Sequence, residues 1–484
     1  MLTFFICVGL LIAGYFTYGV LVERIFQIQP NRQTPAHTQA DGVDYMLMPR
    51  WRIIFIQFLN IAGVGPVFGP ILGALYGPSA LVWIVVGSIF AGGVHDYFSG
   101  MMSIRHKGES IPEVIGDYMG MPARWIMRIF SIVLLMLVGV IFVTAPAALL
   151  TNVVGSDHIF GINTKMFFIA LIFIYYFFAT ILPINQIIGR FYPFFGLLLI
   201  VMTFALFVAL LFSGKEILPN HSLANAQPAG GDLPIWPLLF ITISCGALSG
   251  FHSTQSPLMA RCVDNEKDGR PVFYGSMILE GIVALIWATI GMSFFYNPGE
   301  PFSLGLSQII ANGGPANVVA TSANGLLGGF GGALAMLAVI VLPITSGDTA
   351  FRSTRLIFAD MFNFKQKQIR NRLILALPIF AMGIVLTFVD FQVLWRYFGF
   401  SNQSLAAIML WAGAAYLVAQ GSFHWICSLP ATFMTAVCTA YILSAKIGFN
   451  MQIEYAQIAG IIIGILSLIT FVALKKRIHK PAIA

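Results

Sequence analysis

The sequence has few charged residues. Asp, Glu, Lys and Arg make up only 9% of its 484 residues, whereas hydrophobic residues make up 58%. About a quarter of the residues in a soluble domain are charged, because its surface faces water. This scarcity and a mean hydropathy of +0.86 exclude an ordinary soluble protein. The composition predicts an all-α polytopic membrane protein.

Familiar catalytic motifs are also missing. The sequence contains no His-Glu-x-x-His and no Gly-x-Ser-x-Gly, which argues against an intramembrane hydrolase. It contains no repeated filter segment of the kind that an ion channel uses. A carrier therefore remains as the favoured class, with a nutrient sensor or a channel on a transporter scaffold as the alternative.

Cysteine is scarce, and its spacing matches neither a metal site nor a redox motif. We therefore expect the cysteines to be packing residues, with no cofactor and no resident metal. The five are Cys7, Cys245, Cys262, Cys427 and Cys438.

The basic residues lie in short loops between apolar segments. Nucleic-acid binding is therefore not expected, despite a formal net charge of +7. Thirteen apolar segments are long enough to cross a bilayer, where they would contact membrane lipids. They are 2–22, 51–76, 79–103, 124–153, 166–187, 191–213, 235–259, 272–296, 326–350, 373–390, 399–420, 424–445 and 455–474.

The distribution of Lys and Arg predicts the orientation of these spans. With the N-terminus outside, 22 of the 26 basic residues lie on the inner side of the membrane. Only Lys165, Lys215, Arg396 and Lys446 remain outside. The N-terminus lacks a basic n-region and a cleavage site, so the first span is predicted to be retained. The C-terminus is predicted to be cytoplasmic.

Two short helices are predicted outside the spans. Ser110 and Glu113 have the spacing of a capping box, so a helix should begin there and run toward Met119. In the long outer loop 297–325, residues 304–310 favour a short helix that either dips toward the membrane as a lid or forms a surface loop.

The span 51–76 is interrupted near its middle. Gly63 and Gly65 loosen the backbone, and Pro66 removes an N–H, so the helix should break there. A break at membrane depth is tolerated only where it lines a cavity or is buried in protein. With Asn60 before the break and Pro66 in the first turn after it, the segment is predicted to bind an anionic substrate. A kink that only packs helices is the alternative.

A second interruption occurs in the span 235–259. Small and polar residues, among them Gly246 and Gly250, occupy positions 243–257, where a continuous apolar helix is expected. This break lies five spans after the first, so the two broken helices have opposite orientation. That pattern is typical of an inverted repeat with the substrate site at the repeat interface.

The two breaks predict how the chain is divided. We expect an extra N-terminal helix, a first five-helix repeat, a second inverted five-helix repeat, and two C-terminal helices with a basic tail. Their predicted ranges are 1–22, 45–214, 235–420 and 424–484.

Several polar residues lie in segments that should face hydrocarbon, which marks them as candidates for function. His252 and Gln255 lie one turn apart and either bind one ligand or join two helices. Glu280 either carries a coupling proton or pairs with a neighbouring helix. His95 and Asp96 lie near the inner half of the third span. Paired with each other or with Arg105, they either serve as gate or proton-path groups or form a structural ion pair. Because they are adjacent in the sequence, they should project from different faces of their helix.

The ninth span ends in a polar segment. Thr345, Ser346, Asp348 and Thr349 offer oxygen atoms within about one turn, which suits a hard cation or a proton relay. Asp348 could equally be neutralised by Arg352 as part of an inner gate. Asn402 and Gln403, near the start of the eleventh span, are weaker candidates.

Long motifs in this chain closely resemble the carbon starvation protein A family of bacterial transporters. They are Asn60 to Pro78, Gly93 to Tyr97, Ser103 to Pro112 and Ser346 to Arg352. The resemblance implies a leucine-transporter-like fold in the inner membrane, where the orientation predicted from Lys and Arg places the N-terminus in the periplasm. It also implies uptake of peptides or pyruvate during nutrient limitation, driven by protons more than by sodium. If a single residue carries coupling, Asp348 is favoured, because in other proteins of this fold the corresponding helix lies beside the first broken helix.

Overall fold

The computed structural model describes residues 1–184 and 188–478, which are almost entirely helical. The chain begins with α1 (Leu2–Phe16), α2 (Tyr18–Phe26) and α3 (Pro35–Thr38). The region predicted as the first repeat contains α4 (Arg50–Ala62), α5 (Gly65–Gly73), η1 (Ala74–Tyr76), α6 (Ser79–Gly87), η2 (Ser88–Gly92), α7 (Gly93–Arg105), α8 (Ile111–Val154), α9 (Thr164–Ile181) and α10 (Ile188–Leu211). Between α8 and α9, β1 (His158–Ile159) and β2 (Ile162–Asn163) form an antiparallel hairpin.

The remaining elements follow in the same helical pattern. After α10 comes η3 (Gly230–Asp232). The region predicted as the second repeat contains α11 (Ile235–Thr242), α12 (Phe251–Ala260), η4 (Glu266–Asp268), η5 (Arg270–Tyr274), α13 (Gly275–Phe294), α14 (Leu304–Ala311), α15 (Gly314–Phe362), α16 (Ile369–Leu386) and α17 (Phe391–Ala419). The chain ends with α18 (Trp425–Ser444), α19 (Ile453–Leu474) and η6 (Lys475–Arg477).

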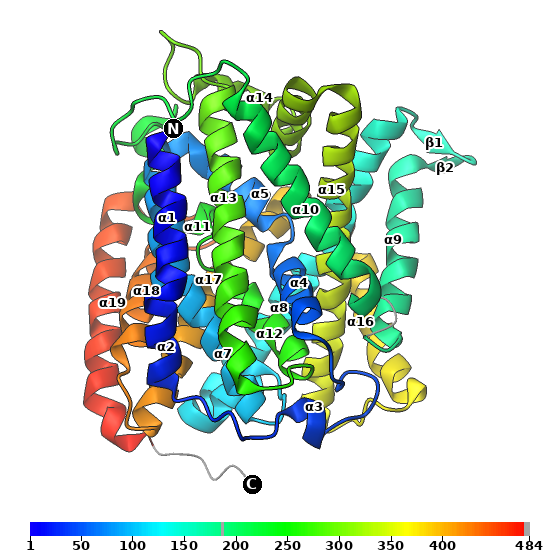
Figure 1. Cartoon of the computed structure of the whole chain (residues 1–484), viewed down its shortest axis with the longest axis vertical. Coiled ribbons are helices and arrows are strands. Elements are labelled where there is room, and N and C mark those ends of the chain that lie inside the picture. Colours follow the sequence, from blue (N-terminus) through cyan, green and yellow to red (C-terminus); the bar gives the residue numbers. More distant parts are fainter. Residues whose placement is uncertain (185–187, 479–484) are drawn as a thin grey trace.

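The helices form one bundle, which Figure 1 shows with α18 and α19 on one flank and α9 and α16 on the other. The N-terminus, the β-hairpin and α14 lie at the upper end of this view, and α3 lies at the lower end. The elements at the upper end all belong to segments predicted as outer, and α3 belongs to a loop predicted as inner.

Within the described residues, 11 helices are long and apolar enough to cross a membrane, or 12 if the bent pair α4 and α5 counts as one span. The predicted seventh span is occupied by α11 and α12, which have 8 and 10 residues and flank the second break. Each half is too short to cross the bilayer alone. The fold therefore agrees with the predicted set of about thirteen spans.

The first predicted break is confirmed. Helix α4 ends at Ala62, Gly63 has φ +29° and ψ −153°, and α5 begins at Gly65 at an angle of 47° to α4. A positive φ is costly for residues other than glycine, which explains Gly63 at this position. As predicted, Pro66 lies in the first turn of α5, where its missing N–H costs nothing.

The second predicted break is also confirmed. Helix α11 ends at Thr242 and α12 begins at Phe251, which leaves residues 243–250 outside both helices. The two breaks touch each other: a Cβ atom built on Gly65 would lie 2.3 Å from the Cys245 Sγ. The bare backbone of one break is therefore packed against the other.

Some predicted boundaries differ from the structure. Helix α8 begins at Ile111 and is non-helical only at Gly120, with φ +83°, so the predicted short helix to Met119 is its first part. The predicted capping box does not form: the Ser110 hydroxyl makes no capping bond, the Ser110 N–H donates to Asp360 Oδ2 at 2.9 Å, and the Glu113 carboxylate binds Arg128 at 2.7 Å.

The ninth predicted span is longer than expected. Helix α15 covers 49 residues and is kinked at Gly328, close to the predicted start at 326. The fifth span was predicted to end at 187, but α9 ends at Ile181, and residues 185–187 lie outside the described residues. The predicted helix at 304–310 is confirmed as α14, and its role as a lid stays a prediction.

Candidate transport site

The broken helices leave backbone groups that other helices satisfy. The Leu59 carbonyl, near the end of α4, accepts a hydrogen bond from the Ser346 hydroxyl on α15 at 3.1 Å. In the second break, the Gly246 N–H donates to Glu280 Oε1 at 3.1 Å, and the Phe251 N–H donates to Asn402 Oδ1 at 2.7 Å. Side chains from neighbouring helices therefore satisfy backbone groups at both breaks. Such partners are required where no water is present to replace them.

Two predicted substrate-binding residues keep polar atoms without a protein partner. Both polar side-chain atoms of Asn60, Oδ1 and Nδ2, are buried and make no hydrogen bond. Gln255 Oε1 is likewise buried and makes none. Asn60 lies just before the first break and Gln255 on the first turns of α12 after the second. Because a buried polar group without a partner is costly, these atoms are available to hydrogen-bond a ligand.

Gly250 and His252 lie at the start of α12 but contact different neighbours. Gly250 is the N-cap residue and packs against the Asn402 carbonyl of α17. The His252 imidazole faces Asp96 and Glu280, whereas the Gln255 Nε2 donates to Thr254 Oγ1 at 2.9 Å. In this structure His252 and Gln255 therefore do not share a contact partner.

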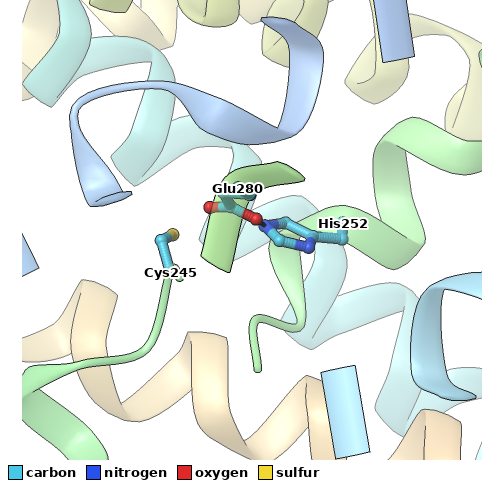
Figure 2. A group of neighbouring side chains, drawn as sticks. All are labelled: Cys245, His252 and Glu280. Atoms are coloured by element: carbon cyan, nitrogen blue, oxygen red, sulfur yellow. Dashed lines mark ion pairs between the residues drawn. The ribbon is translucent and has the colours of Figure 1, made fainter. Parts of the chain in front are cut away.

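A continuous polar network links four side chains, those of His95, Asp96, His252 and Glu280. Asp96 Oδ1 is 2.8 Å from His95 Nδ1, and Asp96 Oδ2 is 2.9 Å from His252 Nδ1. His252 Nε2 lies 3.5 Å from Glu280 Oε2, as Figure 2 illustrates. All four side chains are fully buried.

These contacts decide between the predicted partners of His95 and Asp96. Their pairing with each other is confirmed, because the two side chains hydrogen-bond although they were expected to project from different faces of their helix. The alternative pairing with Arg105 was wrong, since Arg105 binds Glu266 at 3.1 Å. Glu280 lies beside His252 of α12, which agrees with the interpretation that it pairs with a neighbouring helix.

Asp348 lies on α15 between two tyrosines. Tyr175 Oη donates to Asp348 Oδ2 at 2.7 Å, and Tyr192 Oη is hydrogen-bonded to both Asp348 Oδ1 and the Thr345 carbonyl, the latter at 2.6 Å. A tyrosine hydroxyl carries one hydrogen, so Tyr192 cannot donate to both acceptors. Both contacts are satisfied when Asp348 is protonated and donates to Tyr192, which in turn donates to the Thr345 carbonyl.

The other oxygen atoms of this segment bond within their own helix or to α4. The Thr345 and Thr349 hydroxyls donate to the Leu342 and Ser346 carbonyls, respectively. Only Ser346 reaches another helix, at the Leu59 carbonyl. The contacts of α15 with α4 confirm that the Asp348 helix lies beside the first broken helix.

Two arginines that follow Asp348 on α15 form buried ion pairs with one carboxylate. Asp44, in the loop before α4, lies 2.7 Å from Arg352 and 3.1 Å from Arg355. Burial alone would raise the pKa of Asp44, but the guanidinium groups of Arg355 and Arg352 outweigh it and hold the pKa well below its usual range. The predicted neutralisation of Asp348 by Arg352 was therefore wrong, because Arg352 is bound to Asp44.

Sequence reasoning missed several residues of the site. Tyr175 and Tyr192 were read as span residues, although a hydroxyl in an apolar segment is itself a signal of a buried partner. Asp44 lies between the first two predicted spans and was not among the candidates. Asn402 was ranked as a weak candidate, yet it caps α12.

Two broken helices that meet inside one bundle, with buried ionisable groups beside them, define a membrane transporter of the leucine-transporter-like type. The solved structure of MhsT in complex with L-phenylalanine is similar in fold, with a TM-score of 0.58 at 13% identity, over 88% of this chain and 98% of that one. At this identity the similarity concerns the fold alone.

The sequence profile of the carbon starvation protein CstA family matches residues 1–162, 155–304 and 297–441. The chain therefore belongs to this family, as its motifs predicted. Its family and fold identify it as a transporter and not an enzyme.

Individual relatives agree with this assignment. An uncharacterized membrane protein of Haemophilus influenzae is 47% identical over 342 residues, covering 62% of this chain and 92% of the relative. The peptide transporter CstA of Bacillus subtilis is 25% identical over 98% of this chain and 95% of its own length. The pyruvate/proton symporter BtsT of Escherichia coli is 26% identical over 92% of this chain and 82% of its own length.

Proposed function

We propose that this protein imports a small carboxylate, either pyruvate or a short peptide, by alternating access coupled to protons. The observation that carries the proposal is the contact between the two breaks, Gly65 against Cys245, with Asp348 on the adjacent α15. The relatives named as a peptide transporter and a pyruvate/proton symporter support the two substrate classes.

The substrate carboxylate would bind near the start of α5, at Gly63, Gly65 and Pro66. The free positive end of a helix favours an anion at this position. Asn60 and Gln255 would supply the side-chain hydrogen bonds, since both have buried atoms without a protein partner. The backbone near Gly246 and Gly250 would form the facing wall of the site. Because the breaks touch in this structure, they must separate to admit a ligand.

The coupling proton would reside on Asp348. The two contacts of the Tyr192 hydroxyl, with Asp348 and with the Thr345 carbonyl, support a protonated Asp348 in the present arrangement. Loss of that proton would leave Tyr192 with two acceptors for one hydrogen, which favours a rearrangement of α15 against α4. Ser346 links this helix directly to the first break, so the proton and the break would move together. Thr345 and Thr349 would support the relay from the same segment.

Orientation and domain division complete the proposal. The N-terminus would lie in the periplasm and the C-terminus in the cytoplasm, which places the Asp44 ion pairs on the cytoplasmic side of the inner membrane. Residues 1–22 would be an added helix, 45–214 and 235–420 the two inverted repeats, and 424–484 the C-terminal pair with its tail. Opposed orientation of the two broken helices supports this division.

The test is uptake by the purified protein in proteoliposomes. Radiolabelled pyruvate, a dipeptide and an amino acid are supplied separately, each with a proton gradient or a sodium gradient. We expect accumulation of pyruvate or the dipeptide under the proton gradient alone. Ligand binding without net uptake of any of the three would refute the transport proposal and favour a sensor.

Asp348→Asn tests the coupling residue in the same assay. Asn keeps the size of the side chain and its hydrogen-bonding atoms but cannot release a proton. We expect the variant to lose accumulation against a gradient and to retain part of its substrate exchange. Proton-driven accumulation by the variant at the wild-type level would refute the role of Asp348.

A further inference from the structure

We propose that Cys245, His252 and Glu280 form a binding site for a divalent transition metal of the zinc class. The three residues come from the second break, from α12 and from α13, and Figure 2 shows them around a common point. Their ligand atoms, Cys245 Sγ, one His252 ring nitrogen and a Glu280 carboxylate oxygen, all lie within 4.8 Å of one another. All three side chains are buried.

The separations suit a tetrahedral ion. Metal–ligand bonds of about 2.0 to 2.3 Å at tetrahedral angles place neighbouring ligand atoms roughly 3.3 to 3.6 Å apart. His252 Nε2 and Glu280 Oε2 are 3.5 Å apart, which is long for a hydrogen bond and right for two ligands of one ion. Cys245 completes the set after a shift of about 1 Å, which the non-helical segment 243–250 can supply.

The two facing atoms have no other partner. His252 Nε2 and Glu280 Oε2 are both buried and make no hydrogen bond. The other polar atom of each side chain is hydrogen-bonded: His252 Nδ1 to Asp96, and Glu280 Oε1 to the Gly246 N–H. A carboxylate that orients a histidine for metal binding is a recurring arrangement in zinc sites, and His95 in turn orients Asp96 here.

The ligand chemistry selects the class of ion. A thiolate, an imidazole and a carboxylate suit zinc or cobalt, whereas sodium, magnesium and calcium prefer oxygen ligands. The thiolate and the Glu280 carboxylate together neutralise a divalent ion, so the bound site carries no net charge in a buried position. Three protein ligands also leave a fourth position for water or a small anion.

The site lies between the two breaks. The first break approaches Cys245 at Gly65, so an ion here would connect the second break, α12 and α13 at the point where the first break touches them. This inference does not depend on which substrate is transported or on Asp348.

Cobalt provides the test, because a cobalt–thiolate bond absorbs in the near ultraviolet. Cells producing the full-length protein are grown in zinc-depleted medium with cobalt, so that the ion can enter while the protein folds. Metal content and absorption are then measured on the purified protein. We expect about one cobalt per chain and a near-ultraviolet band, both lost in Cys245→Ser.

Two further variants make the result decisive. Cys438→Ser changes a buried cysteine on α18 and should keep both the metal and the band. Glu280→Gln leaves the thiolate and the imidazole in place and should lower the cobalt content severalfold while any bound ion keeps its band. Size-exclusion chromatography selects the folded protein of each variant. Folded wild-type protein without cobalt, or a band that persists in Cys245→Ser, would overturn the proposal.

Discussion

Replacement of Gly65 by alanine should push the two broken helices apart. The added Cβ would lie 2.2 Å from the Cys245 Cβ and 2.3 Å from its Sγ. Carbon atoms in contact are about 3.5 to 4.0 Å apart, so the breaks would have to separate by about 1.3 Å or more. Gly65 is helical and precedes Pro66, so alanine also meets the steric penalty of a helical residue before proline, and the contact with Cys245 adds to it.

The expected size follows from packing energetics. Inserting a methyl group into a well-packed contact costs about 1 to 3 kcal/mol. That cost corresponds to about a 5- to 150-fold shift away from the state in which the breaks touch. The thermal unfolding of Gly65→Ala should therefore begin at a lower temperature than that of the wild-type protein.

A compensating substitution isolates the contact. In Cys245→Gly the nearest remaining atom would be the Cys245 Cα, at an ordinary 3.7 Å from the new Cβ. Adding Gly65→Ala should therefore destabilise the Cys245→Gly variant less than it destabilises the wild-type protein. Gly9→Ala serves as the matched control, because nothing lies within 4 Å of that position. Thermal unfolding is measured in a chelating buffer, and additive effects of the two substitutions would refute the reasoning.

The remaining predictions concern the polar contacts around the breaks. Asp44→Asn should cost about 3 to 5 kcal/mol, because it leaves two buried arginines without their carboxylate. The folded-state pKa of Asp44 is lowered, so its contribution is complete above about pH 4 and is lost only as the pH falls further. The thermal destabilisation of Asp44→Asn should therefore be equal at pH 5.5 and pH 7.5, and a difference between them would contradict this assignment. Tyr192→Phe removes the donor to the Thr345 carbonyl and should shift the pH profile of uptake, whereas an unchanged profile would separate Tyr192 from coupling. Asn402→Ala should destabilise the protein by about 0.5 to 2 kcal/mol by uncapping the Phe251 N–H, and Asn402→Asp should restore stability by retaining the acceptor.

The positions of the breaks could be predicted because they are local. Gly63 and Pro66 exclude a continuous helix from their own backbone chemistry, whatever surrounds them. The opposite orientation of the two broken helices followed from counting spans. The family followed from long motifs such as Ser346 to Arg352.

The partners of the polar residues could not be predicted in the same way. Asp348 was compared with Arg352 because they are one turn apart, but its actual partners are Tyr175 and Tyr192, on two other helices. Arg352 binds Asp44, which is 308 residues away in the sequence. Helical spacing identifies neighbours on one helix only, whereas these contacts depend on how helices are arranged in three dimensions.

The Asp44 ion pairs also constrain how the protein is made. The ribosome adds Asp44 long before Arg352, which comes 308 residues later. The Asp44 carboxylate is therefore expected to remain hydrated until α15 has inserted. Only then can it be desolvated together with the two arginines. The loop before α4 can therefore reach its final contacts only after α15 has been made, although it is among the first parts of the chain to leave the ribosome.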